Sequence, residues 1–262
     1  MSIPIIQVKS LSIELSGNEI LKDISMDIAA GEYVSIIGPN GAGKTTLIKC
    51  IAGIYSTWQG TLRIREKLLS EYKNKELARL MSYVPQAEGR TNPLTVEEFV
   101  ATGRYPHLSA FTTMQPEDHR AVDAALERTD LVPFRQRTMN SLSGGERQMT
   151  FIAAALAQGA SLLLLDEPST FLDYRHQANV AAILTSACRE HGITVLAVHH
   201  DVNTATACSD RIYGIKDGRM VCQGTPEDIA KADVLQNIYD TEFSITPSSD
   251  RTLPLVAAGG AL

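Results

Sequence analysis

The sequence contains no apolar run long enough to cross a membrane. A membrane-spanning helix needs roughly 20 consecutive apolar residues, and no stretch of this chain comes near that length. The first ten residues, MSIPIIQVKS, also lack the basic leader and long apolar core of a secretory signal. We therefore expect that any work at a membrane depends on another chain that holds this one there.

Basic residues are also in short supply. The chain has 24 Lys and Arg against 30 Asp and Glu, which gives a formal net charge of -6, and it contains no basic run. General nucleic-acid binders usually show a basic surplus or a basic cluster. We therefore expect no nucleic-acid partner.

Cysteine is scarce, and its spacing does not indicate a disulfide framework or a metal site. The four cysteines, Cys50, Cys188, Cys208 and Cys222, are scattered along the chain, with no pair at metal-ligand spacing. We interpret them as packing thiols, a use that suits a reducing cytosol.

The order of sequence patterns predicts an α/β fold with a mostly parallel sheet. The first thirty residues alternate as half-buried strands do, and 85–160 is mainly helical in character. The apolar runs at 162–165 and 193–198 indicate strands buried on both faces. We expect one domain at 1–240, with a helical subdomain at about 87–160 inserted in it, and a loosely ordered tail at 241–262 that is rich in Ser, Pro, Gly and Ala.

The segment GPNGAGKT at 38–45 lies between a predicted strand and a predicted helix and matches the phosphate-binding loop G-x-x-x-x-G-K-[ST]. Glycines let successive N–H groups converge on phosphate oxygens, and the helix N-terminus adds a favourable dipole. Lys44 can reach the β- and γ-phosphates, and the Thr45 hydroxyl can ligate Mg²⁺. The pattern predicts a nucleoside triphosphate site made of Gly38, Pro39, Asn40, Gly41, Ala42, Gly43, Lys44, Thr45 and Thr46.

The segment LLLLDEP places two carboxylates at the end of a buried strand. Ligands of open α/β sheets bind at the carboxyl ends of the strands. Asp166 is therefore a candidate Mg²⁺ ligand, and Glu167 is a candidate general base that polarises the attacking water. The pair favours hydrolysis of the bound nucleotide over simple binding.

The segment LSGGERQ at 142–148 predicts a second anion site. Ser143 and Glu146 form a capping-box pair, and Gly144 and Gly145 leave the backbone donors of the first helical turn almost without side-chain cover. Because two glycines at a helix start cost roughly 1 kcal/mol each, a functional role is indicated.

In this order, the three motifs resemble those of the ATPase subunit of ATP-binding cassette (ABC) transporters, over about 8–229. The resemblance implies a P-loop NTPase core with an N-terminal antiparallel β subdomain and an inserted helical subdomain. It implies that Gln86 contacts Mg²⁺ or water and senses the permease, that His200 contacts the γ-phosphate, and that Asp173 lies in the loop that couples two active sites. His199 is then a bystander, although a His-His metal site is the alternative.

The resemblance also implies partners. Two copies would form a head-to-tail dimer, with ATP between the phosphate loop of one copy and the helix start at 143–146 of the other. TGRYPH at 102–107 and DYRHQ at 173–177 resemble the ATPases of importers of iron–siderophore complexes, haem and cobalamin. This branch implies permease contacts near Gln86 and at 104–107, where Arg104, Tyr105 and His107 have the composition of an interface patch. The alternative is that this loop only ends a helix and packs against the subdomain.

The expected function is therefore coupling of ATP hydrolysis to import of a metal chelate, with ferric siderophore ahead of haem or cobalamin. The expected location is peripheral, at the cytoplasmic face of the inner (plasma) membrane, with a periplasmic or extracellular binding protein as an indirect partner. Another transporter branch and a soluble ABC ATPase without a permease stay open. Leu15 stands where the family often has an adenine-stacking aromatic, so adenine packs on an aliphatic side chain or is bound less tightly and selectively.

Overall fold

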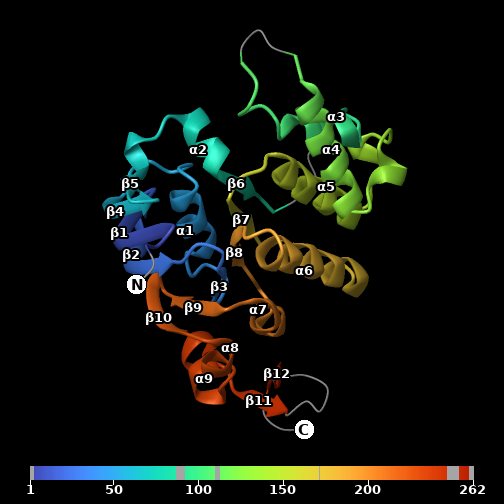
Figure 1. Cartoon of the computed structure of the whole chain (residues 1–262). Helices are drawn as coiled ribbons and strands as arrows, with labels where there is room; N and C mark the ends of the chain where they lie inside the picture. The colour runs from blue at the N-terminus through green and yellow to red at the C-terminus, as the bar shows by residue number, and fades with distance from the viewer. Residues whose placement is uncertain (1–2, 87–91, 110–112, 171, 247–253, 260–262) are drawn as a thin grey trace. The chain divides into compact units, whose positions relative to one another are not determined.

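The computed structural model describes residues 3–86, 92–109, 113–170, 172–246 and 254–259 (Figure 1). The chain divides into two compact units, which we call unit 1 (1–72 and 194–262) and unit 2 (73–193). Parts of three expectations, at 87–91, 110–112 and 247–253, lie outside the described residues. They belong to the helical subdomain, the loop after 107 and the tail.

The N-terminal strands of unit 1 form the predicted antiparallel sheet. β1 (Ile6–Leu15), β2 (Asn18–Ile28), β4 (Gln59–Ile64) and β5 (Lys67–Leu68) lie in the order β2-β1-β4-β5. Ser16 and Gly17 join β1 to β2 with φ of 52° and 80°, the positive values that a two-residue hairpin turn requires. Buried and exposed residues alternate along β1, so one face of this sheet packs inward.

A second set of strands in unit 1 is mostly parallel. β3 (Tyr33–Ile37) pairs in parallel with β8 (Thr194–Val198) and with β9 (Arg211–Lys216), and β10 (Arg219–Gly224) pairs antiparallel with β9. Every residue of β3 and β8 is buried. A strand that is covered on both faces has no polar face, which explains the continuous apolar runs in the sequence.

Short helices and a small hairpin complete unit 1. They are α1 (Lys44–Ile51), the 3₁₀ turn η1 (Leu69–Glu71), α7 (Val202–Cys208), α8 (Pro226–Ile229), α9 (Ala232–Tyr239), β11 (Phe243–Thr246) and β12 (Leu255–Ala258). β11 and β12 pair antiparallel, and Val256 packs into one apolar cluster with α7, α8 and α9. The described part of the tail is thus a hairpin docked on the domain, whereas its composition predicted loose order.

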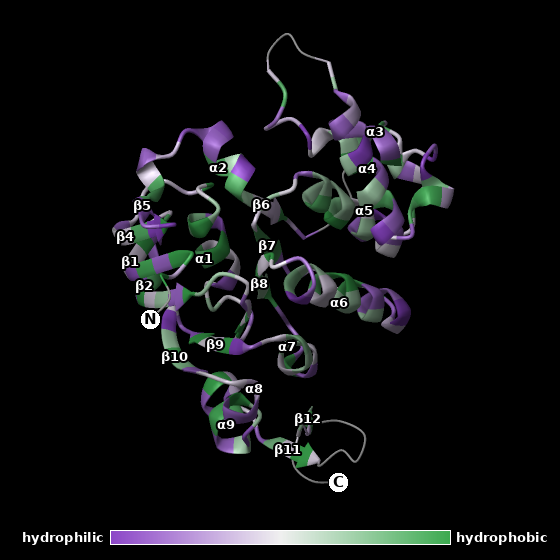
Figure 2. Ribbon diagram, viewed as in Figure 1, coloured by the Kyte–Doolittle hydropathy of each residue, from purple (hydrophilic) through white to green (hydrophobic). Residues whose placement is uncertain are grey.

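Unit 2 contains a parallel strand pair and most of the helices. β6 (Met81–Val84) pairs with β7 (Leu162–Asp166). The helices are α2 (Asn74–Leu80), α3 (Val96–Thr102), α4 (Pro116–Arg128), α5 (Gly144–Ala157) and α6 (Tyr174–Arg189), with 3₁₀ turns η2 (Val132–Phe134) and η3 (Met139–Ser141). α3, α4 and α5 pack together, and Figure 2 shows the mixture of hydrophobic and hydrophilic residues along α4 and α6 that such packing requires.

Two capping boxes form in unit 2, and the one at Ser143 was predicted. Thr95 N–H donates to Glu98 Oε2 at 2.8 Å, and Ser143 N–H donates to Glu146 Oε2 at 2.7 Å. These reciprocal bonds fix where α3 and α5 begin.

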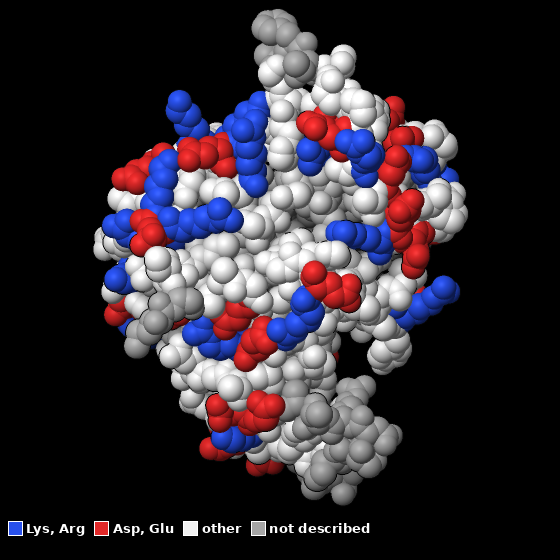
Figure 3. Space-filling model, viewed as in Figure 1, with Lys and Arg blue, Asp and Glu red and all other residues white. Residues whose placement is uncertain are grey.

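On the surface, Lys and Arg are interspersed with Asp and Glu over the face that Figure 3 shows, so neighbouring charges largely offset one another.

Candidate active site

The loop that joins β3 to α1 is shaped by glycines. Gly38 has φ of 148°, and a Cβ added there would lie 2.0 Å from Ile215 O. Gly43 has φ of 101°, and its added Cβ would lie 2.6 Å from Leu21 Cδ2. At Gly41, nothing lies within 4 Å of such an atom. The outer two glycines are therefore required by the protein's own packing, whereas the middle one leaves open space beside the loop.

Lys44 places its charge inside this loop. Its side chain is buried, and Nζ donates to Gly38 O at 2.8 Å and to Pro39 O at 2.9 Å. The turn between β9 and β10 also contacts this loop, since Gly218 N–H donates to Ala42 O at 3.2 Å. A cation surrounded by curled backbone at the start of a helix is the arrangement that binds phosphate.

The two adjacent histidines have different environments. His199 is 3% exposed, and its Nε2 lies 3.3 Å from Tyr33 Oη. Burial lowers the pKa of His199 to about 4, so this ring is neutral at physiological pH. His200 is exposed. Since β3 and β8 are parallel, with Ile36 opposite Val198, the phosphate loop and His200 follow the same edge of the sheet.

In unit 2, the end of β7 carries the two predicted carboxylates. Asp166 is 4% exposed, and its Oδ2 accepts from Tyr83 Oη at 3.4 Å. Glu167 Oε2 accepts from Thr170 Oγ1 at 2.9 Å and from Gln86 Nε2 at 3.4 Å. The structure thus brings together two of the predicted catalytic residues, Gln86 and Glu167. Thr170 was missed, although it stands three residues after Glu167 in the sequence.

The backbone of Glu167 is strained. Its φ is 50°, in the left-handed region that costs a non-glycine residue about 1 kcal/mol or more. It also precedes Pro168, which disfavours helical conformations in the residue before it. Backbone strain of this kind concentrates at functional sites, and here it turns the Glu167 side chain toward Gln86 and Thr170.

The start of α5 is the third predicted element. An added Cβ on Gly144 would meet nothing within 4 Å, whereas one on Gly145 would lie 2.6 Å from the His176 ring. His176 Nδ1 lies 2.8 Å from Asp173 Oδ1. Asp173 thus contacts His176, and the His176 ring lies close against Gly145. His176 belongs to the motif DYRHQ at 173–177, and the resemblance assigned it no role.

The family model described as "ABC transporter" matches residues 21–170. This match covers more than half of the chain and includes all three motifs. The chain belongs to the ABC transporter family. It is 35% identical to "Iron(3+)-hydroxamate import ATP-binding protein FhuC" of Bacillus subtilis (strain 168), over 95% of this chain and 94% of that protein.

Two further members extend the comparison. The chain is 34% identical to "Hemin import ATP-binding protein HmuV" of Shewanella denitrificans, over 96% of this chain and 99% of that protein. The structure matches "Dimeric structure of a post-hydrolysis state of the ATP-binding cassette MJ0796 bound to ADP and Pi" with a TM-score of 0.73 and 28% identity, over 84% of this chain and 98% of that one. The predicted ABC ATPase fold is confirmed.

One expected interface residue of this ABC protein is structural. Arg104 is 9% exposed, its Nε donates to Asp118 Oδ1 at 2.9 Å, and its Nη1 donates to Ala157 O at 2.8 Å. His107 Nε2 lies 2.8 Å from Gln158 O. The prediction that Arg104 is a surface anchor for the permease is wrong, because its guanidinium joins α4 to the end of α5. The other two members of the patch, Tyr105 at 70% exposure and His107, are exposed.

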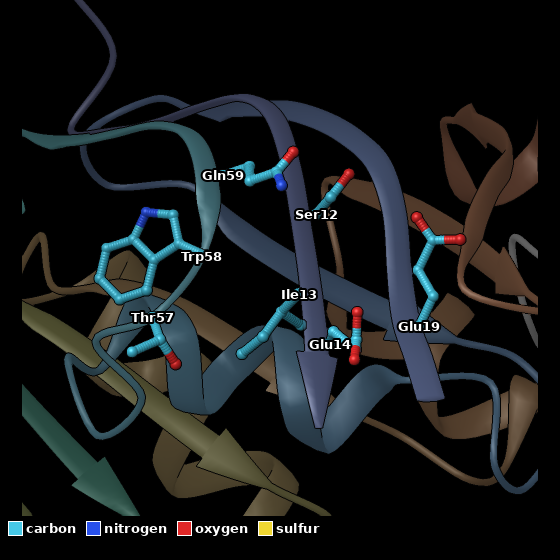
Figure 4. Close-up of a pocket in the computed structure, with 7 residues that line it drawn as sticks. All are labelled: Ser12, Ile13, Glu14, Glu19, Thr57, Trp58 and Gln59. Atoms are coloured by element: carbon cyan, nitrogen blue, oxygen red, sulfur yellow. The ribbon is translucent and has the colours of Figure 1, made fainter. Parts of the chain in front are cut away.

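A separate hollow of about 490 Å³ lies on the N-terminal sheet (Figure 4). Its lining is Ser12, Ile13, Glu14, Glu19, Thr57, Trp58 and Gln59. These residues include neither Leu15 nor any member of the phosphate loop, so the hollow is distinct from the phosphate site.

In the part of the chain that the structure describes, no helix is both long and apolar enough to span a bilayer.

Proposed function

We propose that this chain is the ATP-hydrolysing subunit of a membrane importer for a metal chelate. The observation that carries the hydrolytic part is the Glu167 carboxylate, which Gln86 and Thr170 hold at the end of β7. A carboxylate fixed by two hydrogen bonds can orient a water molecule and accept its proton. Gln86 thereby also connects the water-activating group to the segment that follows β6.

The phosphate-binding part is assigned to residues 38–46. The backbone N–H groups and Lys44 hold the phosphates, and His200 contacts the γ-phosphate from the neighbouring strand end. Thr45 has a hydroxyl oxygen, Gln86 an amide oxygen and Asp166 a carboxylate oxygen, and we assign these three residues to Mg²⁺ because oxygen donors suit that ion. When bound, Mg²⁺ would neutralise charge that develops on the phosphates during transfer to water.

We propose that the working form is a head-to-tail dimer. The open space beside Gly144 and the N–H groups at the start of α5 suit contact with a nucleotide held by a second copy. Ser143, Gly145, Glu146 and Asp173 complete that contact surface. The dimeric MJ0796 structure, "bound to ADP and Pi", supports this arrangement in a related cassette.

The expected domain boundaries are kept in this proposal: an ABC ATPase domain at 1–240, its helical insert at about 87–160, and a tail at 241–262.

The cargo is inferred from the relatives' names, which specify iron(3+)-hydroxamate and hemin import. Ferric siderophore is the first candidate, followed by haem and cobalamin. Transport places the chain on the cytoplasmic face of the membrane, bound to a permease, with an extracytoplasmic binding protein as an indirect partner.

The test of the transport part is a tagged pull-down from detergent-solubilised membranes of the native source. We expect a polytopic permease with the wild-type chain and much less of it with Tyr105→Ala. Glu117→Gln, at an exposed site on α4, is the control and should recover as much permease as the wild type. Recovery of soluble proteins alone would contradict the importer assignment and favour an ABC ATPase that works without a permease.

A further inference from the structure

The C-terminal hairpin is fastened to the segment that carries His200. Asn203 Nδ2 donates to Val256 O at 2.9 Å, and Val256 N–H donates to Asn203 Oδ1 at 2.9 Å. The Asn203 side chain therefore pairs with the backbone of β12 as a neighbouring strand would. The two residues are 53 positions apart in the chain and both lie in unit 1.

The same Asn203 amide also contacts Asp201, the neighbour of His200. Its Nδ2 lies 3.4 Å from Oδ1 of Asp201, the residue directly after His200. Asp201 caps α7, because its carboxylate accepts from Asn203 N–H at 3.2 Å and from Thr204 N–H at 2.9 Å. One amide thus connects the helix cap to β12.

The backbone on either side of His200 is held by different structures. His199 N–H donates to Ile36 O at 3.0 Å, so the strand ladder fixes the chain up to His199. From Asp201 onward, the chain belongs to the cap and first turn of α7. His200 is the residue between them, so its place depends on the strand end and on the start of α7.

α7 depends on packing for its position. It has only 7 residues, fewer than the roughly 12 at which an isolated helix becomes even marginally stable in water. Its buried residues Val202 and Ala205 share an apolar cluster with Val256 of β12 and Leu235 of α9. The cluster also contains Ile37, which directly precedes the phosphate loop.

We propose that Asn203 is a positioning residue, which uses the docked strand β12 to set the start of α7 and thereby the place of His200 at the γ-phosphate. The proposal rests on the ATP-hydrolysing function assigned above. Asn203 itself does not contact the nucleotide in this proposal, and the catalytic residues assigned above stay the same. The hairpin thereby supports His200 independently of the phosphate loop.

The test uses the full-length chain and three variants that act on the two sides of the contact. Asn203→Ala removes both hydrogen bonds, and Asn203→Asp is nearly isosteric but cannot donate to Val256 O. Val256→Pro removes the backbone donor from the strand. Asn237→Ala, on an exposed position of α9, is the matched control.

We measure steady-state phosphate release and the binding of a fluorescent ATP analogue. We expect kcat to fall roughly tenfold in all three variants, because small misplacements of a catalytic group have effects of this order or larger. KM and analogue affinity should stay within about twofold of the wild type, since the phosphate loop is untouched. In the double variant Asn203→Ala, Val256→Pro, the loss should be no larger than in either single one.

A wild-type kcat in folded Asn203→Ala or Asn203→Asp would overturn the proposal. So would a rise in KM without a fall in kcat, which would indicate a role in nucleotide binding. If Asn203→Ala does not fold, the isosteric Asn203→Asp decides. Absence of phosphate release from the wild-type chain would instead refute the ATP-hydrolysing function itself, so the two failures are distinguishable.

Discussion

The sharpest stability prediction concerns the Arg104–Asp118 pair. The two side chains are 11% and 4% exposed, and Nε and Oδ1 lie 2.9 Å apart. Removal of one member of a buried ion pair costs 3–5 kcal/mol, because the other is left uncompensated. Since Arg104 keeps slight exposure, we place Arg104→Ala and Asp118→Ala near the lower end, at about 3 kcal/mol of the free energy of unfolding each.

The assay is urea unfolding of the purified full-length chain, followed by far-ultraviolet circular dichroism. The double variant should lose less than the sum of the single losses, because both remove the same interaction. Tyr105→Ala is the control, and we expect a change within about 0.5 kcal/mol, since its side chain is mostly exposed. If Arg104→Ala is as stable as the wild type, the Arg104–Asp118 pair does not stabilise the fold and the reasoning is refuted.

The same pair predicts a pH dependence. The Gln115 N–H and the Arg104 guanidinium hold the pKa of the Asp118 carboxyl below its usual value of 3.8. A carboxyl with a lowered folded-state pKa adds stability above its unfolded-state pKa, and that stability is lost as the pH falls through the folded-state value. The gap in stability between wild type and Asp118→Ala should therefore be constant near neutrality and should narrow below about pH 4.

Three further predictions follow from single contacts. Gly38→Ala should abolish binding of the ATP analogue, because its Cβ would lie 2.0 Å from Ile215 O; retained affinity would mean that the loop can shift. His199→Leu should lose less stability than the wild type as the pH falls from 6.5 to about 4. In that range the His199 ring, with its pKa lowered to about 4 by burial, is neutral when folded but becomes protonated when unfolded. If the urea midpoint of His199→Leu depends on pH as that of the wild type does, the ring is accessible to protons in the folded state. His176→Ala should partly restore the stability lost in Gly145→Ala, whose Cβ would meet the ring at 2.6 Å, and additive losses would contradict that contact.

Features encoded by neighbouring residues could be predicted from the sequence. The apolar runs of β7 and β8 and the capping box at Ser143 formed as expected. Each depends on residues that are close in the chain, so periodicity and spacing contain the information. The motif at 38–45 is equally local, and its glycine requirements follow directly from its backbone.

Features that depend on distant partners could not be predicted. The sequence shows that Arg104 is an arginine in a polar loop, but its carboxylate partner and the carbonyl of Ala157 come from two other helices. The tail reads as loosely ordered because Val256 and its neighbours are few and weakly patterned, yet they dock on α7 through Asn203. His176 gains its place only through the fold, which brings α6 to the start of α5.

The measurement that tests the central claim most directly is phosphate release from Mg²⁺-ATP by the wild type and by Glu167→Gln, together with gel filtration of each. Glu190→Gln, at the exposed end of α6, is the matched control and should hydrolyse ATP at the wild-type rate. The account predicts turnover in the wild type, loss of at least about a hundredfold in Glu167→Gln through removal of the general base, and an ATP-dependent dimer of that variant. Wild-type turnover in Glu167→Gln would contradict the catalytic assignment.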